Sequence, residues 1–156
     1  ADWKALGVLE PAELRDLGPD KIRLLTYVSN WNHFRNTAPV CQFVPWSIVN
    51  LVDLVSAVTG WNTSAFELMK LGERVCTMAR VYNIREGFSA KDDNIPERLL
   101  TGFSSGPLEG VSIDKNEFQQ AIKYYYESMG WDKEGIPTTF KLHELSIPWA
   151  KEYINA

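Results

Sequence analysis

The sequence is poor in the side chains from which proteins usually build a metal centre or a nucleophilic active site. Its 156 residues include only two cysteines and two histidines, whereas a structural zinc or iron–sulfur centre usually takes four protein ligands. The chain therefore has neither a disulfide framework nor a complete metal site of its own. His33 and His143 lie far apart in the chain and in no recognised catalytic spacing, so we expect surface or packing roles for both.

Long apolar runs and an excess of basic residues are missing as well. No apolar stretch approaches the roughly 20 residues that a membrane-spanning helix needs, and the first residues lack the basic and apolar regions of a secretory signal. The net charge is -4, and no basic stripe suits a phosphate backbone. We therefore predict a soluble, cytoplasmic protein that binds neither membrane nor nucleic acid. The first residue is not methionine, which is consistent with a domain excised from a longer chain.

The residues that are present describe an ordinary globular chain. Apolar residues make up 45% of the sequence and charged residues 23%, a balance typical of folded domains and unlike that of disordered chains. A chain of this length can bury a substantial core. We therefore predict one domain that spans residues 1–156.

Apolar residues recur at helical spacing in four segments, near residues 19–36, 46–59, 64–82 and 114–129. Strand-like alternation is nearly absent, so we predict an all-α, multihelical array. The valines of the second segment leave a strand possible, and Gly72 could divide the third segment into two helices. We expect the second and third helices to share one core, made of Val75, Met78, Tyr82, Ile48, Leu51 and Val55.

Local signals indicate where the helices begin and end. Pro39 disfavours helical geometry in the residue before it, so the first helix should end near residues 36–39, with Cys41 just beyond. Ser-x-x-Glu at 64–67 and Asp-x-x-Glu at 114–117 are typical of helix N-termini. Two further segments are expected, namely a Gly- and Pro-rich loop at 87–110 with one helical turn near 96–100, and a short last helix at 138–145.

Several polar clusters have structural interpretations beside functional ones. Lys-Asp-Asp at 91–93 could hold a cation or an acid–base pair, and a solvated loop or helix cap is the alternative. Of the three consecutive tyrosines at 124–126, only one can point inward from a helix. Salt bridges are expected along the third helix, among Arg74, Arg80, Arg85, Glu73 and Glu86.

The two cysteines differ in their predicted surroundings. Cys76 falls inside a helix, where cysteine usually behaves as a small buried hydrophobe. Cys41 follows a helix-ending loop, from which a thiolate could reach a metal cluster held mainly by another domain; a plain buried thiol is the alternative. A ligand role requires Cys41 to lie at the surface, with apolar neighbours such as Val40, Phe43 and Trp46 in an exposed patch.

Several short sequences occur in a characteristic order and spacing. They are Thr-Gly-Trp-Asn at 59–62, Leu-Gly-Glu-Arg-Val at 71–75, Arg-Val-Tyr-Asn-Ile-Arg-Glu-Gly-Phe at 80–88, Lys-Asp-Asp-Asn-Ile-Pro-Glu-Arg at 91–98, Tyr-Tyr at 124–125, Gly-Trp-Asp at 130–132 and Gly-Ile-Pro-Thr at 135–138. With these sequences, the chain from about residue 24 to residue 145 resembles the carboxy-terminal domain of the aldehyde ferredoxin oxidoreductase family.

The resemblance implies a tungsten or molybdenum ion held by two pterin dithiolenes, beside a 4Fe-4S cluster that passes electrons to ferredoxin. In this family three cluster cysteines lie in an earlier domain, and the fourth closes an Asp-x-x-Gly-Leu-Cys motif whose backbone also contacts a pterin. Residues 36–41 correspond to that motif, which implies that Cys41 is a cluster ligand and that Asn36, Val40 and Cys41 contact the cofactors. The implied partners are upstream domains of the same polypeptide, ferredoxin, and an aldehyde or related substrate.

The chain departs from this motif, since Asn36 replaces the aspartate, Pro39 the glycine and Val40 the leucine. Proline has no amide donor, so any contact made by the glycine amide is lost, whereas asparagine still accepts and donates hydrogen bonds without a charge. Cluster ligation is therefore better supported than pterin binding. These departures favour a divergent subfamily, and related enzymes of the family reduce aromatic thioesters.

Two functions are open on sequence grounds. The first is a fragment of a redox enzyme that is inactive alone, because it lacks the three upstream cysteines and the first half of the pterin site. The second is a helical interaction or scaffold domain that has lost the cofactors, which Asn36 and Pro39 permit. A Cys-x-x-Cys-x-x-x-Cys run in the upstream coding sequence would favour the first.

Overall fold

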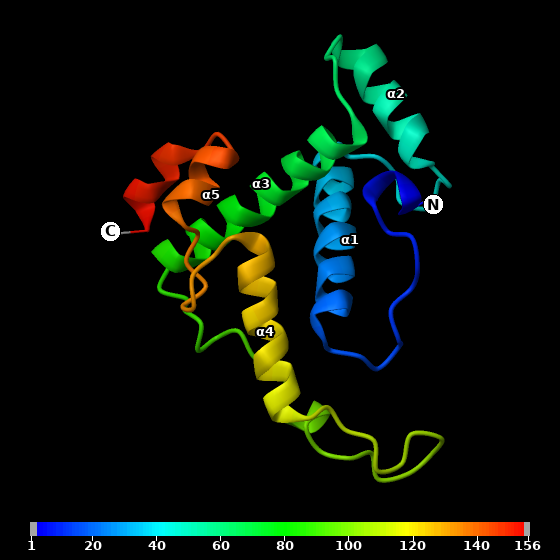
Figure 1. Cartoon of the computed structure of the whole chain (residues 1–156), viewed down its shortest axis with the longest axis vertical. Coiled ribbons are helices and arrows are strands. Elements are labelled where there is room, and N and C mark those ends of the chain that lie inside the picture. The colour runs from blue at the N-terminus through cyan, green and yellow to red at the C-terminus, as the bar shows by residue number, and fades with distance from the viewer. Residues whose placement is uncertain (1–2, 155–156) are drawn as a thin grey trace.

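The computed structural model describes residues 3–154, and within that range it contains helices and no β-strand (Figure 1), which confirms the all-α prediction. Five α-helices are joined by loops and by three short 3-10 helices. Their bounds are η1 Trp3–Leu6, α1 Pro19–Thr37, α2 Ile48–Thr59, α3 Ala65–Arg85, η2 Glu97–Leu99, α4 Lys115–Met129, α5 Thr139–Glu144 and η3 Pro148–Tyr153. No helix in the described range is both long and apolar enough to cross a membrane.

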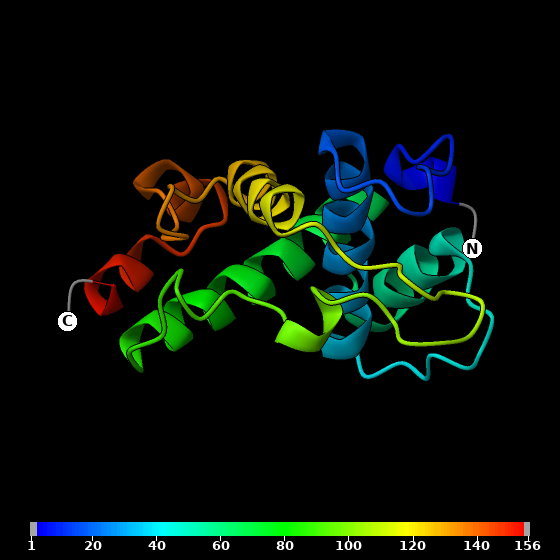
Figure 2. The same cartoon turned by 90° about the horizontal axis from the view of Figure 1, so that it is seen from below.

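Helix α3 is the central element of the fold. Figures 1 and 2 show α1, α2 and η1 gathered around its N-terminal half, whereas α5 and η3 lie at its C-terminal end. Of the two alternatives for this segment, one long helix is found, and Gly72 does not divide it but marks the point where α3 crosses α1. A Cβ atom on Gly72 would lie 1.8 Å from the carbonyl oxygen of Asn30. Only a residue without a side chain allows the two backbones to approach so closely.

The predicted shared core is wrong in its α3 part. Ile48 and Leu51 are buried with residues from the first turns of α3, but Met78 and Tyr82 are 40% and 56% exposed. A helix of 21 residues is roughly 30 Å long, so its two ends cannot reach the same partners. The C-terminal part of α3 instead contributes Val81 to a separate cluster with α5 and η3.

The helix ends agree with the local sequence signals. The Ser64 hydroxyl accepts a hydrogen bond from the amide of Glu67, and a carboxylate oxygen of Asp114 accepts from the amides of Asn116 and Glu117. Such caps satisfy amides that have no partner within the helix. Gly60 adopts a left-handed conformation with φ 73°, which ends α2 as a helix and excludes the strand alternative. The η1 and η3 helices were not predicted from the sequence.

Arg80, in the C-terminal half of α3, pairs with a distant segment rather than with a neighbour on the helix. Arg80 is buried and binds Asp93 in the following loop, with a shortest nitrogen–oxygen distance of 2.7 Å. The Tyr126 hydroxyl donates to the same carboxylate, and Arg80 Nε donates to the Gly135 carbonyl. The predicted helix-local pairing holds for Arg85 with Glu86, but Arg80 pairs across the fold. Asp93 is therefore a structural residue that fixes the loop and α4 to α3.

Candidate functional site

The loop after α1 carries the residues that the sequence singled out. Helix α1 ends at Thr37, and Cys41 follows four residues later as an exposed free thiol. Its neighbour Phe43 is 98% exposed, and Val44 is 39% exposed. The predicted surface position is therefore confirmed for Cys41 and for Phe43 of the expected apolar patch, whereas Val40 and Trp46 are only partly exposed.

Two side chains from the last turn of α1 hold this loop in place. Arg35 donates from its guanidinium to the Gln42 carbonyl at 3.3 Å, and the Gln42 side-chain amide donates to Asn36 Oδ1 at 2.5 Å. Both contacts join the end of α1 to the residue directly after Cys41, so they close a short loop around the cysteine. Arg35 and Gln42 were not anticipated from the sequence, because these contacts depend on the folded path of the loop.

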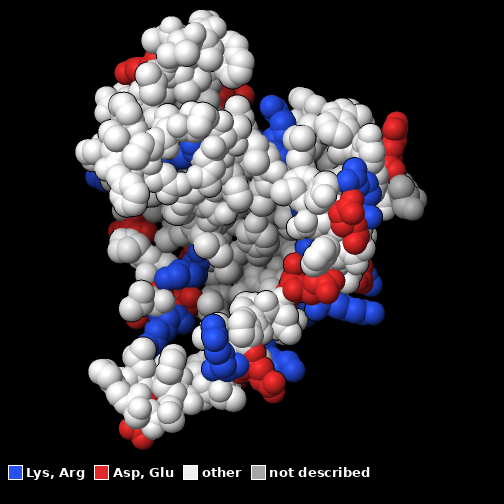
Figure 3. Space-filling model, turned by 180° about the vertical axis from the view of Figure 1, so that it is seen from behind, with Lys and Arg blue, Asp and Glu red and all other residues white. Residues whose placement is uncertain are grey.

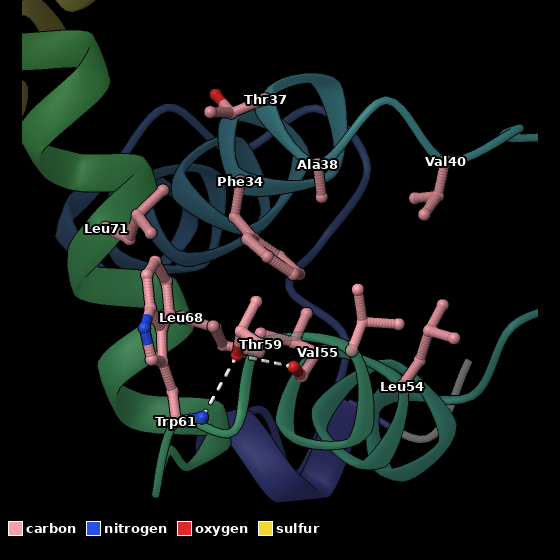
Figure 4. Close-up of a pocket in the computed structure, with 11 residues that line it drawn as sticks. Phe34, Thr37, Ala38, Val40, Leu54, Val55, Thr59, Trp61, Leu68 and Leu71 are labelled. Atoms are coloured by element: carbon pink, nitrogen blue, oxygen red, sulfur yellow. Dashed lines mark hydrogen bonds between the residues drawn. The ribbon is translucent and has the colours of Figure 1, made fainter.

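A pocket of about 340 Å³ opens next to this loop, between α1, α2 and the start of α3. Figure 4 shows Ala38 and Val40 on one side and Leu54 and Val55 of α2 on the opposite side, with the Phe34 ring between them. Its remaining walls come from Thr37, Val58, Thr59, Trp61, Leu68 and Leu71. A signal for this pocket exists in the sequence, because α2 is apolar on more than one face and carries Asp53 as its only charged residue.

The two hydroxyl side chains of the pocket, Thr37 and Thr59, are already bonded within the protein. The Thr37 hydroxyl donates to the His33 carbonyl at 2.9 Å. The Thr59 hydroxyl donates to the Val55 carbonyl and accepts from the Trp61 amide (Figure 4). A hydroxyl has only one hydrogen to donate. The pocket therefore presents mainly apolar surface, and of its side-chain donors only the indole N–H of Trp61 is not engaged by these bonds.

The second cysteine lies apart from this site. Cys76 is partly buried in α3, and its sulfur lies 3.6 Å from the Tyr125 hydroxyl. Burial raises the pKa of the Cys76 thiol above its ordinary value, so the reactive thiolate is disfavoured. This position agrees with the prediction of a small hydrophobic residue within a helix. Cys76 lies within α3, whereas Cys41 lies in the loop after α1.

A buried charged network occupies the other side of α3. Glu73 binds Lys141 at 2.6 Å and Lys70 at 2.7 Å, and Glu144 binds both lysines at 2.5 Å. Burial lowers the pKa of Lys70, but hydrogen bonds and charges from Glu144 and Glu73 raise it overall above its ordinary value. Every member has an opposite charge, so this cluster stabilises the contact between α3 and α5 and offers no free acid or base.

No metal centre is assembled by the fold within residues 3–154 alone. Within this range no group of three or more His, Cys, Asp or Glu side chains could hold a metal ion. His143 is exposed on α5 and His33 is half-buried on α1, so the two histidines lie on different elements. The Lys-Asp-Asp cluster at 91–93 is also structural, since Asp92 accepts from the amide of Ser89 while Asp93 pairs with Arg80.

Comparisons with known proteins agree on one family. A family model described as "Aldehyde ferredoxin oxidoreductase, domains 2 & 3" matches residues 2–147. A tungsten-containing aldehyde ferredoxin oxidoreductase from Pyrococcus furiosus is 28% identical over 146 residues, which cover 91% of this chain and 24% of that protein. The WOR-like subunit of an aliphatic sulfonate oxidoreductase from the same organism is 29% identical over 129 residues, covering 78% of this chain and 21% of the relative.

A solved structure shows the same fold. The active site complex BamBC of benzoyl coenzyme A reductase, in complex with 1,5-dienoyl-CoA, superposes with a TM-score of 0.72. The match is 20% identical and covers 99% of this chain and 24% of the other. The chain thus spans about a quarter of the length of the relatives it matches. Because the family model matches nearly the whole sequence, the chain belongs to the aldehyde ferredoxin oxidoreductase family.

Proposed function

We propose that the chain is the carboxy-terminal domain of a longer tungsten–pterin oxidoreductase, in which Cys41 supplies one ligand of a 4Fe-4S cluster. The observation that carries this proposal is an exposed, free thiol on a short loop held by Arg35 and Gln42, within a region that matches the family. The described residues supply no other ligands near it. The remaining ligands must therefore come from another part of the polypeptide, and the isolated chain is inactive.

The residues of the loop fit a cluster better than they fit a pterin. A cysteine thiolate is the usual ligand of iron–sulfur clusters, and Cys41 is accessible to one. Asn36 already accepts from Gln42 with its side-chain oxygen, which leaves its amide hydrogens for a pterin. Pro39 offers no backbone donor, and Val40 can contribute only its amide and apolar contact. We therefore place Cys41 at the cluster, and Asn36 and Val40 at the edge of the pterin site.

When bound, the tungsten or molybdenum pterin supplies the two-electron chemistry, and the cluster passes single electrons to ferredoxin. The substrate in this proposal is an aldehyde or a related carbonyl compound. The chain's own residues contribute a ligand and one wall of the site, because no His, Cys, Asp, Glu, Lys or Arg side chain lines the pocket beside Cys41.

A second candidate function is a helical scaffold domain that has lost the cofactors. The specific observations that favour it are Pro39 in place of a glycine and the engagement of Asn36 by Gln42, which occupies the oxygen that replaces the family's carboxylate. In that case Cys41 has no metal partner even in the full-length protein.

Metal analysis and spectroscopy of the full-length protein test the proposal. The wild-type protein should contain tungsten or molybdenum, four irons per chain and the electron paramagnetic resonance signal of a reduced 4Fe-4S cluster. Cys41→Ser should disturb that signal and slow electron transfer. Cys76→Ser is the matched control and should leave the signal intact. A full-length Cys41→Ser protein with a normal cluster contradicts the proposal, and a wild-type protein without metal supports the scaffold function.

A further inference from the structure

We propose that the pocket beside Cys41 and the outer face of α2 form a docking surface for the part of the full-length polypeptide that carries the remaining cluster ligands. This inference rests on the proposed function, because that function requires a partner segment at Cys41. It goes further by naming the surface to which that segment binds and the chemistry that surface accepts.

The chemistry of the pocket selects an apolar occupant. No Lys, Arg, Asp or Glu lines it, and the hydroxyls of Thr37 and Thr59 already donate to backbone carbonyls. A charged group placed there would lose its hydration and meet no opposite charge, which is costly. An aliphatic or aromatic side chain would instead fill the space between Phe34 and Trp61, as anchor residues do at the centre of protein interfaces.

The apolar surface continues beyond the pocket, which favours a polypeptide over a small molecule. Figure 3 shows that the surface over α2, at the upper left of that view, is almost free of charged side chains. Val58 and Trp61 of the pocket lining are 77% and 59% exposed, and exposed apolar side chains extend beyond that lining to Val49 at 61%, Phe66 at 57% and Phe43 at 98%. A small molecule in the pocket would leave Val49, Phe66 and Phe43 in water, whereas a larger protein surface can cover them as well.

Continuity with Cys41 identifies which polypeptide binds. Val40 is a wall of the pocket and is also the residue directly before Cys41. A segment that brings a cluster to the Cys41 sulfur therefore comes within one residue of this pocket wall. Helix α2 lies at the periphery of the fold in Figure 1, and its Val49 and Val58 side chains are exposed, so its outer face is accessible to such a segment. Relatives of about four times this length contain enough additional chain to supply it.

A single charge on the exposed face tests the proposal. Val58→Lys places a cation at the pocket rim, and Phe140→Lys is the matched control on α5 at the opposite end of α3, where Phe140 is 79% exposed. Neither change should alter the melting temperature of the isolated chain, because both side chains are exposed. In the full-length protein, Val58→Lys should lower the iron content at least about twofold, since a buried unpaired charge opposes docking. Phe140→Lys should leave the iron content unchanged.

Three outcomes distinguish the possible failures. If full-length Val58→Lys keeps its iron while Cys41→Ser loses it, the docking surface is wrong and the proposed function stands. If both variants keep a normal cluster, the proposed function itself fails. If the isolated chain sediments as a dimer that Val58→Lys dissociates, while the full-length variant keeps its iron, the occupant is a second copy and the proposal is overturned. Should Val58→Lys unfold the isolated chain, Val49→Lys, on the outer face of α2, replaces it.

Discussion

The crossing of α1 and α3 at Gly72 makes a sharp prediction about stability. In Gly72→Ala the new methyl group would lie 1.8 Å from the Asn30 carbonyl oxygen and 2.9 Å from the Phe34 amide nitrogen. Both atoms belong to the backbone, so no side-chain rotation relieves the clash. The helices must separate by roughly 1 Å or more, and overpacking of this kind typically costs about 1–3 kcal/mol, occasionally more.

The intrinsic helix preference acts in the opposite direction, which makes the sign of the result informative. Alanine is more favourable than glycine in a helix interior by about 1 kcal/mol. A net loss of stability in Gly72→Ala can therefore come only from the clash with the α1 backbone. We expect the net loss in unfolding free energy to lie at the upper end, about 3 kcal/mol, because the separation also loosens the buried contacts of Trp31 and Phe34. For a chain of this size, that corresponds to a fall in Tm of about 6–12 °C.

Chemical denaturation of the isolated chain measures this change, with Ala79→Gly as the control. Ala79 is exposed on the same helix, so its replacement should cost about 1 kcal/mol through helix preference alone. A Gly72→Ala chain that is as stable as the parent, or more stable, would refute the close crossing of the two backbones.

Three further predictions concern the core, the buried tyrosine and the thiols. Leu51→Ala, at a side chain that is 1% exposed, should lower the unfolding free energy by about 2–5 kcal/mol in denaturant titrations; an unchanged midpoint would contradict its burial. Burial and the hydrogen bond to Asp93 raise the pKa of Tyr126 to about 12, so its contribution to stability is present below about pH 10 and is lost as the pH rises towards 12. Tyr126→Phe should reduce this alkaline loss, and an unaltered pH profile of unfolding would count against it. A thiol reagent should modify Cys41 rapidly in the native chain and Cys76 much more slowly, since only Cys41 is exposed; equal rates would exclude this assignment.

The helices were predictable because their signals are local. Ser64 and Asp114 cap the helices that follow them, and Pro39 lies just beyond the end of α1. Each of these effects operates within one turn of backbone, so neighbouring residues suffice to predict it. The resemblance to a family was equally visible in the sequence, and the comparisons bear it out. The extent of a single domain over residues 1–156 stays a prediction.

The partners of the helix faces were not predictable in the same way. Periodicity shows which face of α3 is apolar but does not show which helix that face meets, and this is why Met78 and Tyr82 were placed in a core from which they are absent. The partner of Arg80 was predicted wrongly for a similar reason. Its acidic partner, Asp93, comes from a loop and not from the adjacent helical turn. At the site, Cys41 and its exposure were foreseen, whereas the pocket between Phe34 and Trp61 required three elements to be placed in space.

The two ends of α3 are stabilised by different forces, and this difference agrees with the proposed docking. From the middle of α3 to its C-terminal end, ion pairs such as Lys141 with Glu73 and Arg80 with Asp93 join the helix to the loops and helices of the same chain. A buried charge without its partner is strongly unfavourable, so these contacts are complete within the chain. Around its first half, the partners α1 and α2 leave an open apolar pocket beside Cys41. An apolar surface can be covered by any apolar partner of matching shape, because this burial leaves no charge without a partner. An added segment can therefore bind beside Cys41 while the ion-paired half of the fold remains unchanged.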